Sequence, residues 1–291
     1  MALEYNYKVN EGGTTNRPSE TETFFDTCYV ESDLSPIDNF FDNTKDLNIL
    51  ISVLSTIPSS LQKKNFNLIL LGQISAVESY LREIIRKLII HDIESKQTSA
   101  GMQLSYGAAL NYTLEILPEA LMEQVSFASK KNIISTFKDF LNIKGHLPNE
   151  VSEALEEFEK ICQLRHCVIH RFGKLGSNNA LKLGIDVHAE CLEKPLSLDE
   201  SHLYDTYIIC KNLVLVLNSY LFKSILQRTT VIDGFWTWDL RKDKKKFREY
   251  YEIFKSDRAS ETPAGTLNLA YQALKEYYEE ERLGNTRRRN R

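Results

Sequence analysis

The chain has 291 residues, of which 42% are hydrophobic and 26% charged, an ordinary balance for a globular protein with a core. Only 12 glycines and 7 prolines occur, which excludes collagen-like, low-complexity and turn-dense all-β chains. The net charge of −4 is unevenly spread, because residues 241–291 alone hold 14 basic and 9 acidic side chains, a net of +5. The acidic total therefore does not exclude a polyanion as partner.

The first third of the chain predicts an arm followed by two helices. Residues 1–36 are polar and indicate an N-terminal arm, with at most a short strand. Helical character begins at residue 37, with one helix predicted over residues 37–57 and a longer one over residues 65–94. The longer helix is expected to bury the apolar residues that recur with a 3.6-residue period. These are Leu70, Ile74, Val77, Leu81, Ile84, Ile85 and Leu88.

The middle third predicts shorter elements and then one long helix. A loop is expected over residues 95–106. Three helices should follow it, over residues 107–117, 118–126 and 130–141. The next helix is predicted over residues 149–172, with Asn149 as its cap. Beyond it, apolar and polar residues alternate, which favours a short β element. The alternating apolar residues are Leu181, Leu183, Ile185 and Val187.

A last bundle helix is predicted over residues 201–227, and residues 229–291 read as a C-terminal appendage with a helix over residues 267–282. The fold class expected from these elements is mainly α, a helical bundle with one short β element and a helical appendage. The expected organisation is an arm (1–36), a bundle (37–228) and a basic, aromatic appendage (229–291).

Cysteine usage and apolar runs indicate a cytoplasmic protein. The five cysteines are scattered, odd in number and form no C-x-x-C pair, which is typical of reduced thiols. The first residues lack the basic and apolar regions of a signal peptide. No apolar run approaches the ~20 residues that span a bilayer, so no membrane contact is expected. Motifs for nucleotide-driven, nicotinamide-dependent or zincin chemistry are missing as well, and no cofactor is expected.

The segment over residues 164–171 concentrates ionisable side chains. On an ideal helix, Arg165 falls in the middle of an apolar arc, and His166 and His170 stack at its edge. The arc comprises Leu155, Phe158, Ile161, Cys162, Val168, Ile169 and Phe172. An arginine on a buried face requires an anionic partner or an interface. Glu78 projects onto the apolar arc of the helix over residues 65–94, so a Glu78–Arg165 contact is predicted.

Two interpretations of this cluster are open. The first is a structural ion pair that sets how two helices pack. The second is chemistry, because histidine transfers protons near neutral pH and arginine stabilises a phosphate that gains charge. This minimal set suits metal-free RNA cleavage, in which a ribose 2′-hydroxyl attacks the adjacent phosphate. Arg165 and His170 point about 140° apart on one helix, so both serve one site only at a helix edge or with a second protomer.

At these residues the sequence resembles the HEPN superfamily, whose signature is an arginine, a polar residue, three further positions and a histidine. Arg165, His166 and His170 fit this R-x4-H form, and Arg171 and Gly173 match the family's frequent H-R-x-G ending. The resemblance covers residues 37–227. It implies a helical bundle that forms a homodimer and joins two motifs in one cleft.

For many members, the resemblance also implies metal-independent endoribonuclease activity in toxin–antitoxin, phage-defence or RNA-processing systems. Carried over by position, Arg165 and His170 are catalytic, His166 is the supporting polar residue, and Glu78 and Arg171 assist. The expected partners are RNA, a second copy of the chain, and an antitoxin or defence-system protein. Some members lack catalysis, so a non-catalytic dimerisation or partner-binding module is the alternative.

Two further readings concern metal and RNA. Cys162, His166 and His170 are spaced like metal ligands, and zinc would need a fourth ligand such as His202 or Cys191; no metal is nevertheless the expectation, since a cytosolic cysteine on an apolar arc is usually core. In the C-terminal part, aromatic and basic residues interleave as in RNA-binding segments. The RNA-binding candidates are Trp236, Trp238, Arg241, Lys242, Lys244, Lys245 and Lys246. The alternative is that the tryptophans anchor the appendage to the bundle and the basic run is solvated.

Overall fold

The computed structural model describes residue 9 and residues 20–54, 56–259 and 265–289, and the side chains of residues 59, 60 and 284–289 are not described. The chain divides into two units, residues 1–33 and residues 34–291. In the described part of the first unit, the regular element is a short 3-10 helix, Thr21–Phe24. The second unit is a helical bundle, and the described residues hold twelve α-helices and no β-strand, which confirms the mainly α fold class.

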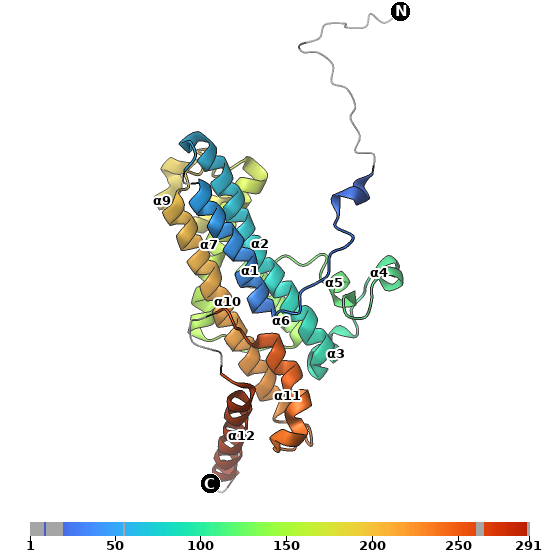
Figure 1. Ribbon diagram of the computed structural model, residues 1–291. Coiled ribbons are helices and arrows are strands. Elements are labelled where there is room, and N and C mark those ends of the chain that lie inside the picture. Colours follow the sequence, from blue (N-terminus) through green and yellow to red (C-terminus); the bar gives the residue numbers. More distant parts are fainter. Residues whose placement is uncertain (1–8, 10–19, 55, 260–264, 290–291) are drawn as a thin grey trace, which may run out of the picture. The chain divides into compact units, whose positions relative to one another are not determined.

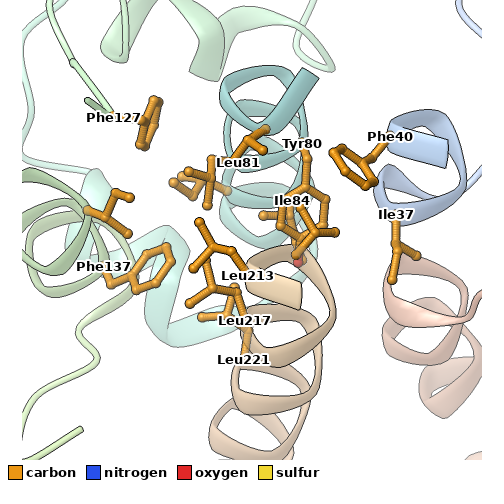
Figure 2. Close-up of a cluster of buried hydrophobic side chains, with 14 of the residues drawn as sticks. Ile37, Phe40, Tyr80, Leu81, Ile84, Phe127, Phe137, Leu213, Leu217 and Leu221 are labelled. Atoms are coloured by element: carbon orange, nitrogen blue, oxygen red, sulfur yellow. The ribbon is translucent and has the colours of Figure 1, made fainter. Parts of the chain in front are cut away.

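Four long helices build the bundle: α1 (Pro36–Leu54), α2 (Ser59–His91), α7 (Asn149–Arg171) and α10 (Glu200–Thr229). They pack against one another side by side (Figure 1). The seven apolar positions predicted for α2 are all fully buried, because they repeat with the period of the helix and form one continuous face. Figure 2 shows Tyr80, Leu81 and Ile84 of α2 between the aromatic rings of neighbouring elements and the leucines of α10.

The shorter helices of the middle third are α3 (Ile93–Ser99), α4 (Tyr106–Asn111), α5 (Leu117–Leu121) and α6 (Lys130–Leu141), and side-chain caps start all of them except α5. The Asp92 carboxylate accepts a hydrogen bond from the backbone N–H of Ser95, so a new helix starts where a loop was predicted. The helix predicted at residues 130–141 is confirmed with the same bounds, and Ser129 caps it. The helices predicted at residues 107–117 and 118–126 are each much shorter than expected.

The β element predicted after the motif helix is wrong. Its residues form two short helices, α8 (Ser177–Leu183) and α9 (Ile185–His188), separated by Gly184 at φ 102°. Because these helices are only one or two turns long, their apolar residues mimic the two-residue period of a strand. The one β-like contact among the described residues is an isolated antiparallel bridge between Lys174 and Pro195. Asn149 is also not a cap: α7 begins after Pro148 without a side-chain cap.

The α10 helix is by length and composition alone long and apolar enough to cross a membrane, a feature not recognised in the sequence. In the bundle it packs against α1, α2 and α7, and Leu213, Leu217 and Leu221 are fully buried (Figure 2). Burial in the core accounts for these leucines without a bilayer.

Residues after 229 share the core of the bundle. They form α11 (Leu240–Phe254) and α12 (Leu267–Arg289), and Trp236, Phe247 and Tyr250 belong to the same buried cluster as α2 and α10. Asp243 is buried and accepts hydrogen bonds from the backbone N–H groups of Thr237 and Trp238 and from the Tyr271 hydroxyl. These bonds outweigh the effect of burial and lower the pKa of Asp243, so a carboxylate ties the two helices to the segment before them.

Candidate functional site

The predicted contact between α2 and α7 is present. Nη2 of Arg165 lies 3.7 Å from Oε1 of Glu78, an ion-pair distance that is too long for a hydrogen bond. The two side chains retain 26% and 24% of their exposure, so the pair lies at the edge of the bundle and not in its interior. A half-exposed pair stabilises the fold only weakly. Arg165 is thus oriented by Glu78 while part of its guanidinium remains accessible to a ligand.

The two histidine rings are neighbours on one side of α7, as the helix period predicts, with their planes tilted by 47°. The ring centroids of His166 and His170 are 5.7 Å apart, and His170 is exposed while His166 is half-buried. Burial lowers the pKa of His166, and the positive charges of Arg165, His170 and Lys182 lower it further. The neutral form of His166 is therefore favoured near neutral pH, which is the form that accepts a proton.

We expect an NMR titration to give His166 a pKa below its ordinary value of 6.5. Replacing Arg165 by methionine should raise that pKa, because it removes the nearest cation and keeps much of the volume. Lys182→Met should raise it less, since Lys182 has the smallest effect of the three cations. A function that needs neutral His166 should then decline as the pH falls through its lowered pKa. An unchanged pKa in Arg165→Met would contradict this electrostatic account.

Arg171 has a structural position. Its Nη2 donates to both carboxylate oxygens of Glu193, at 2.6 and 2.7 Å, and its guanidinium lies over Gly176. A Cβ atom added at Gly176 would come within 2.5 Å of Arg171 Nη1, so the Arg171 side chain would have to move to accommodate it. The Arg171 side chain therefore ties the end of α7 to the loop after α9, and its role in supporting a catalytic site stays a prediction.

The end of α7 presents apolar side chains to solvent, which the sequence reading missed. Phe172 and Gly173 both have positive φ, at 52° and 91°, and the Gly173 N–H returns to the Cys167 carbonyl, as in a Schellman motif. Phe172 is 83% exposed and Ile169 47% exposed, so their predicted place in the buried arc is wrong. The sequence did contain a signal for this exposure, because the glycine at position 173 indicates that the helix ends at Phe172, beyond the buried face.

Arg165 and His170 are not joined within one chain. The described contacts connect Arg165 to Glu78 and His170 to His166, while both act electrostatically on His166. The sequence-based expectation of divergent projections accounts for this result, since five residues of helix turn the two side chains away from each other. A reaction that uses both groups at one phosphate requires a second copy of α7 or a movement of Arg165.

The metal interpretation gains no support. Within the ranges that the structure describes, no group of three or more His, Cys, Asp and Glu side chains is arranged to hold a metal ion. Cys162 is fully buried in the core, and burial raises the pKa of its thiol to about 12. His202 instead forms a capping box with Asp199 at the start of α10.

The aromatic candidates for RNA binding are engaged in packing. Trp236 is 5% exposed, contacts the rings of Phe247 and Tyr250, and donates its indole N–H to Thr229. Trp238 stacks on Tyr278, with ring centroids 4.0 Å apart. Both rings are therefore engaged in packing in this conformation, as the anchoring alternative expects, and the prediction that they bind RNA bases gains no support. The sequence cannot distinguish these roles, since both use aromatic residues beside cations.

The basic candidates are placed differently. Lys246 donates to the Phe235 carbonyl and lies 4.3 Å from the centre of its ring. Arg241, Lys242, Lys244 and Lys245 are exposed on α11. A surface hollow of about 740 Å³ lies elsewhere, between α1, Tyr207 and Arg258, and does not include the motif.

Comparison with protein-family models, with curated proteins and with solved structures gave no match to this chain.

Proposed function

We propose that this chain is a metal-independent endoribonuclease of HEPN type, acting in the cytoplasm as the toxic effector of a bacterial phage-defence or toxin–antitoxin system. The observation that carries the proposal is the group at the C-terminal half of α7. There, a partly exposed Arg165 oriented by Glu78 lies beside His166 and His170, whose rings are neighbours and of which His170 is exposed. Such a group combines an anion-binding cation with proton-transfer residues, and it is accessible to a substrate as large as RNA.

The chemistry follows from these groups. His170 removes the proton of a ribose 2′-hydroxyl, whose oxygen then bonds to the adjacent phosphorus. Arg165 stabilises the additional negative charge of the five-coordinate phosphorus. The bond from phosphorus to the 5′-oxygen breaks, and that oxygen takes the proton that His170 had removed, which returns the histidine to its neutral form. The products are a 2′,3′-cyclic phosphate and a 5′-hydroxyl, so atoms and charges balance without a metal.

A homodimer completes the site in this proposal. Arg165 and His170 of one chain point apart, and two chains that meet through α7 place the Arg165 of one copy beside the His170 of the other. The exposed side chains of Ile169 and Phe172 supply an apolar surface for such contact at the same end of the helix.

The test is RNA cleavage by the purified wild-type protein in the presence of EDTA. We expect cleavage to persist and the 3′ ends to resist ligation or extension until a phosphatase that opens cyclic phosphates has acted. Products with a free 3′-hydroxyl would contradict the mechanism. A broad RNA panel left intact, with the partner or activator from the same operon supplied, would overturn the enzyme assignment.

The second candidate is a non-catalytic module that holds an antitoxin or another defence subunit. The exposed Phe172 favours it, because a large ring at positive φ in solvent suits a protein interface. Expression in a bacterial host separates the candidates. A ribonuclease should arrest growth while its His170→Ala variant does not, whereas a binding module should give the same growth in both cases.

A further inference from the structure

The α11 helix has two faces of opposite character. Its inner face is buried by Phe247, Tyr250 and Phe254, with Asp243 bonded beneath it. Its outer face carries four exposed cations at positions i, i+3, i+4 and i+7, a spacing that aligns them on one side of a helix. We call this set the basic stripe: Arg241, Lys244, Lys245 and Arg248. At 1.5 Å per residue, the stripe extends about 10 Å along the helix.

The basic stripe is not neutralised by its surroundings. In the described part of the chain, no ion pair or side-chain hydrogen bond connects its four side chains to an acidic group. The nearby acid Glu252 pairs with Lys255, and Glu249 acts on His91 across the contact with α2. Like charges four residues apart weaken a helix, and the stripe contains two such pairs. Its charge is therefore available to an external anion.

The surroundings of the stripe favour recognition of phosphates over bases. The neighbouring rings that would stack on bases are occupied, since Trp236 is buried and Trp238 stacks on Tyr278. Contacts to phosphates position a nucleic acid without reading its sequence. A double-stranded segment suits such a surface best, because it hides its bases and presents its phosphates as a dense, regular array of negative charge.

The stripe is also separate from the motif on α7. The inner face of α11 reaches α2 at Asp92, which acts on Tyr250, whereas Arg165 reaches α2 at Glu78. Glu78 and Asp92 lie about 20 Å apart along the α2 axis at 1.5 Å per residue. In Figure 1, α9, which follows the motif helix, and α11 lie toward opposite ends of the bundle. Docking and cleavage are thus assigned to different side chains.

We propose that the basic stripe is a sequence-independent docking surface for the phosphate backbone of a double-stranded RNA segment. The choice of RNA as the polyanion rests on the proposed function, whereas the presence of a phosphate-binding surface does not. The stripe holds the substrate by charge alone. Affinity should therefore depend strongly on salt and little on base sequence.

The experiment measures binding of labelled RNA hairpins of different sequence by fluorescence anisotropy over a range of salt concentrations. The protein carries His170→Ala to prevent cleavage. Four phosphate contacts predict a slope of log K against log salt of about −3.6, and one remaining contact predicts about −0.9. We expect the triple variant Lys244→Ala, Lys245→Ala, Arg248→Ala to show the shallow slope. Alanine favours helix, so α11 should be retained, as circular dichroism will show.

The matched control removes the same charge from α6 and the loop after it, through Lys131→Ala, Lys138→Ala and Lys144→Ala, all exposed positions. This control should keep the steep slope. An unchanged slope in the α11 variant would overturn the docking surface, as would preference for anionic vesicles or polyglutamate over RNA. If the α11 variant loses binding but the wild type cuts no RNA, only the proposed function fails. If the wild type cuts RNA and the α11 variant binds it normally, only the docking surface fails.

Discussion

Replacing Arg165 or His170 by alanine is expected to reduce RNA cleavage by about 10²- to 10⁴-fold, the range for loss of a general base or a preorganised cation. Stability should change little, because the Glu78–Arg165 pair is half-exposed and His170 is exposed. The measurement is the initial rate on a fluorescent RNA, together with a urea unfolding curve for each variant.

Two matched variants control for loss of charge and of imidazole. Arg258 pairs with Asp42 at an exposed position outside the motif, and His146 is an exposed loop histidine. Arg258→Ala and His146→Ala should therefore retain wild-type rates. Equal rates in Arg165→Ala and in wild type would remove Arg165 from the mechanism.

Mixing the two inactive variants tests whether the site forms between chains. If Arg165 of one copy acts with His170 of the other, a mixed dimer contains one complete site and one that lacks both residues. Random pairing makes half of the dimers mixed, so unfolding and refolding the variants together should restore about a quarter of wild-type activity. If no activity is restored, Arg165 and His170 of the same chain act together, which requires Arg165 to move toward His170.

The largest loss of stability is expected from Arg228→Met, at about 3–5 kcal/mol of unfolding free energy, because it leaves a buried charge without compensation. Arg228 lies near the end of α10 and donates to the Asp92 carboxylate, to the Leu141 carbonyl and to the Ser95 hydroxyl. Asp92 is only 2% exposed, and it also caps α3. One guanidinium thus joins α10, the α2–α3 junction and α6.

The measurement is urea unfolding at neutral pH. Arg258→Met is the matched control, because it breaks the half-exposed Arg258–Asp42 pair and should cost at most about 1 kcal/mol. The double variant Arg228→Met, Asp92→Asn should recover part of the loss, since asparagine removes the uncompensated charge and still caps a helix well. A loss below about 1 kcal/mol in Arg228→Met would show that Asp92 is compensated by other groups.

Helix periodicity explains which features could be predicted from sequence. The fully buried stripe on α2 and the proximity of His166 and His170 depend on side-chain direction along a single helix, and the Glu78–Arg165 contact depends on that direction in two helices that pack together. The period of 3.6 residues determines that direction, whatever the rest of the fold. The same reasoning failed for residues 177–188, where helices of one or two turns are too short to distinguish a helical period from a strand period.

Exposure could not be predicted in this way. The sequence places Ile169 and Phe172 on the apolar side of α7, but whether another element covers the end of that side depends on where the chain turns after Gly173. Likewise, the aromatic and basic residues around Trp236 and Trp238 suit RNA binding, and only the packing of these rings against α11 and α12 shows their structural role.

By itself, therefore, the sequence determined the mainly α class, the long helices and the side of each helix on which the ionisable residues lie. These are local properties set by backbone geometry and by the spacing of apolar residues. The tertiary structure decided which of these residues meet and which face solvent. It oriented Arg165 by Glu78, left His170 and the basic stripe accessible, and packed the tryptophans against α11 and α12, because contacts between distant segments depend on how the whole chain packs.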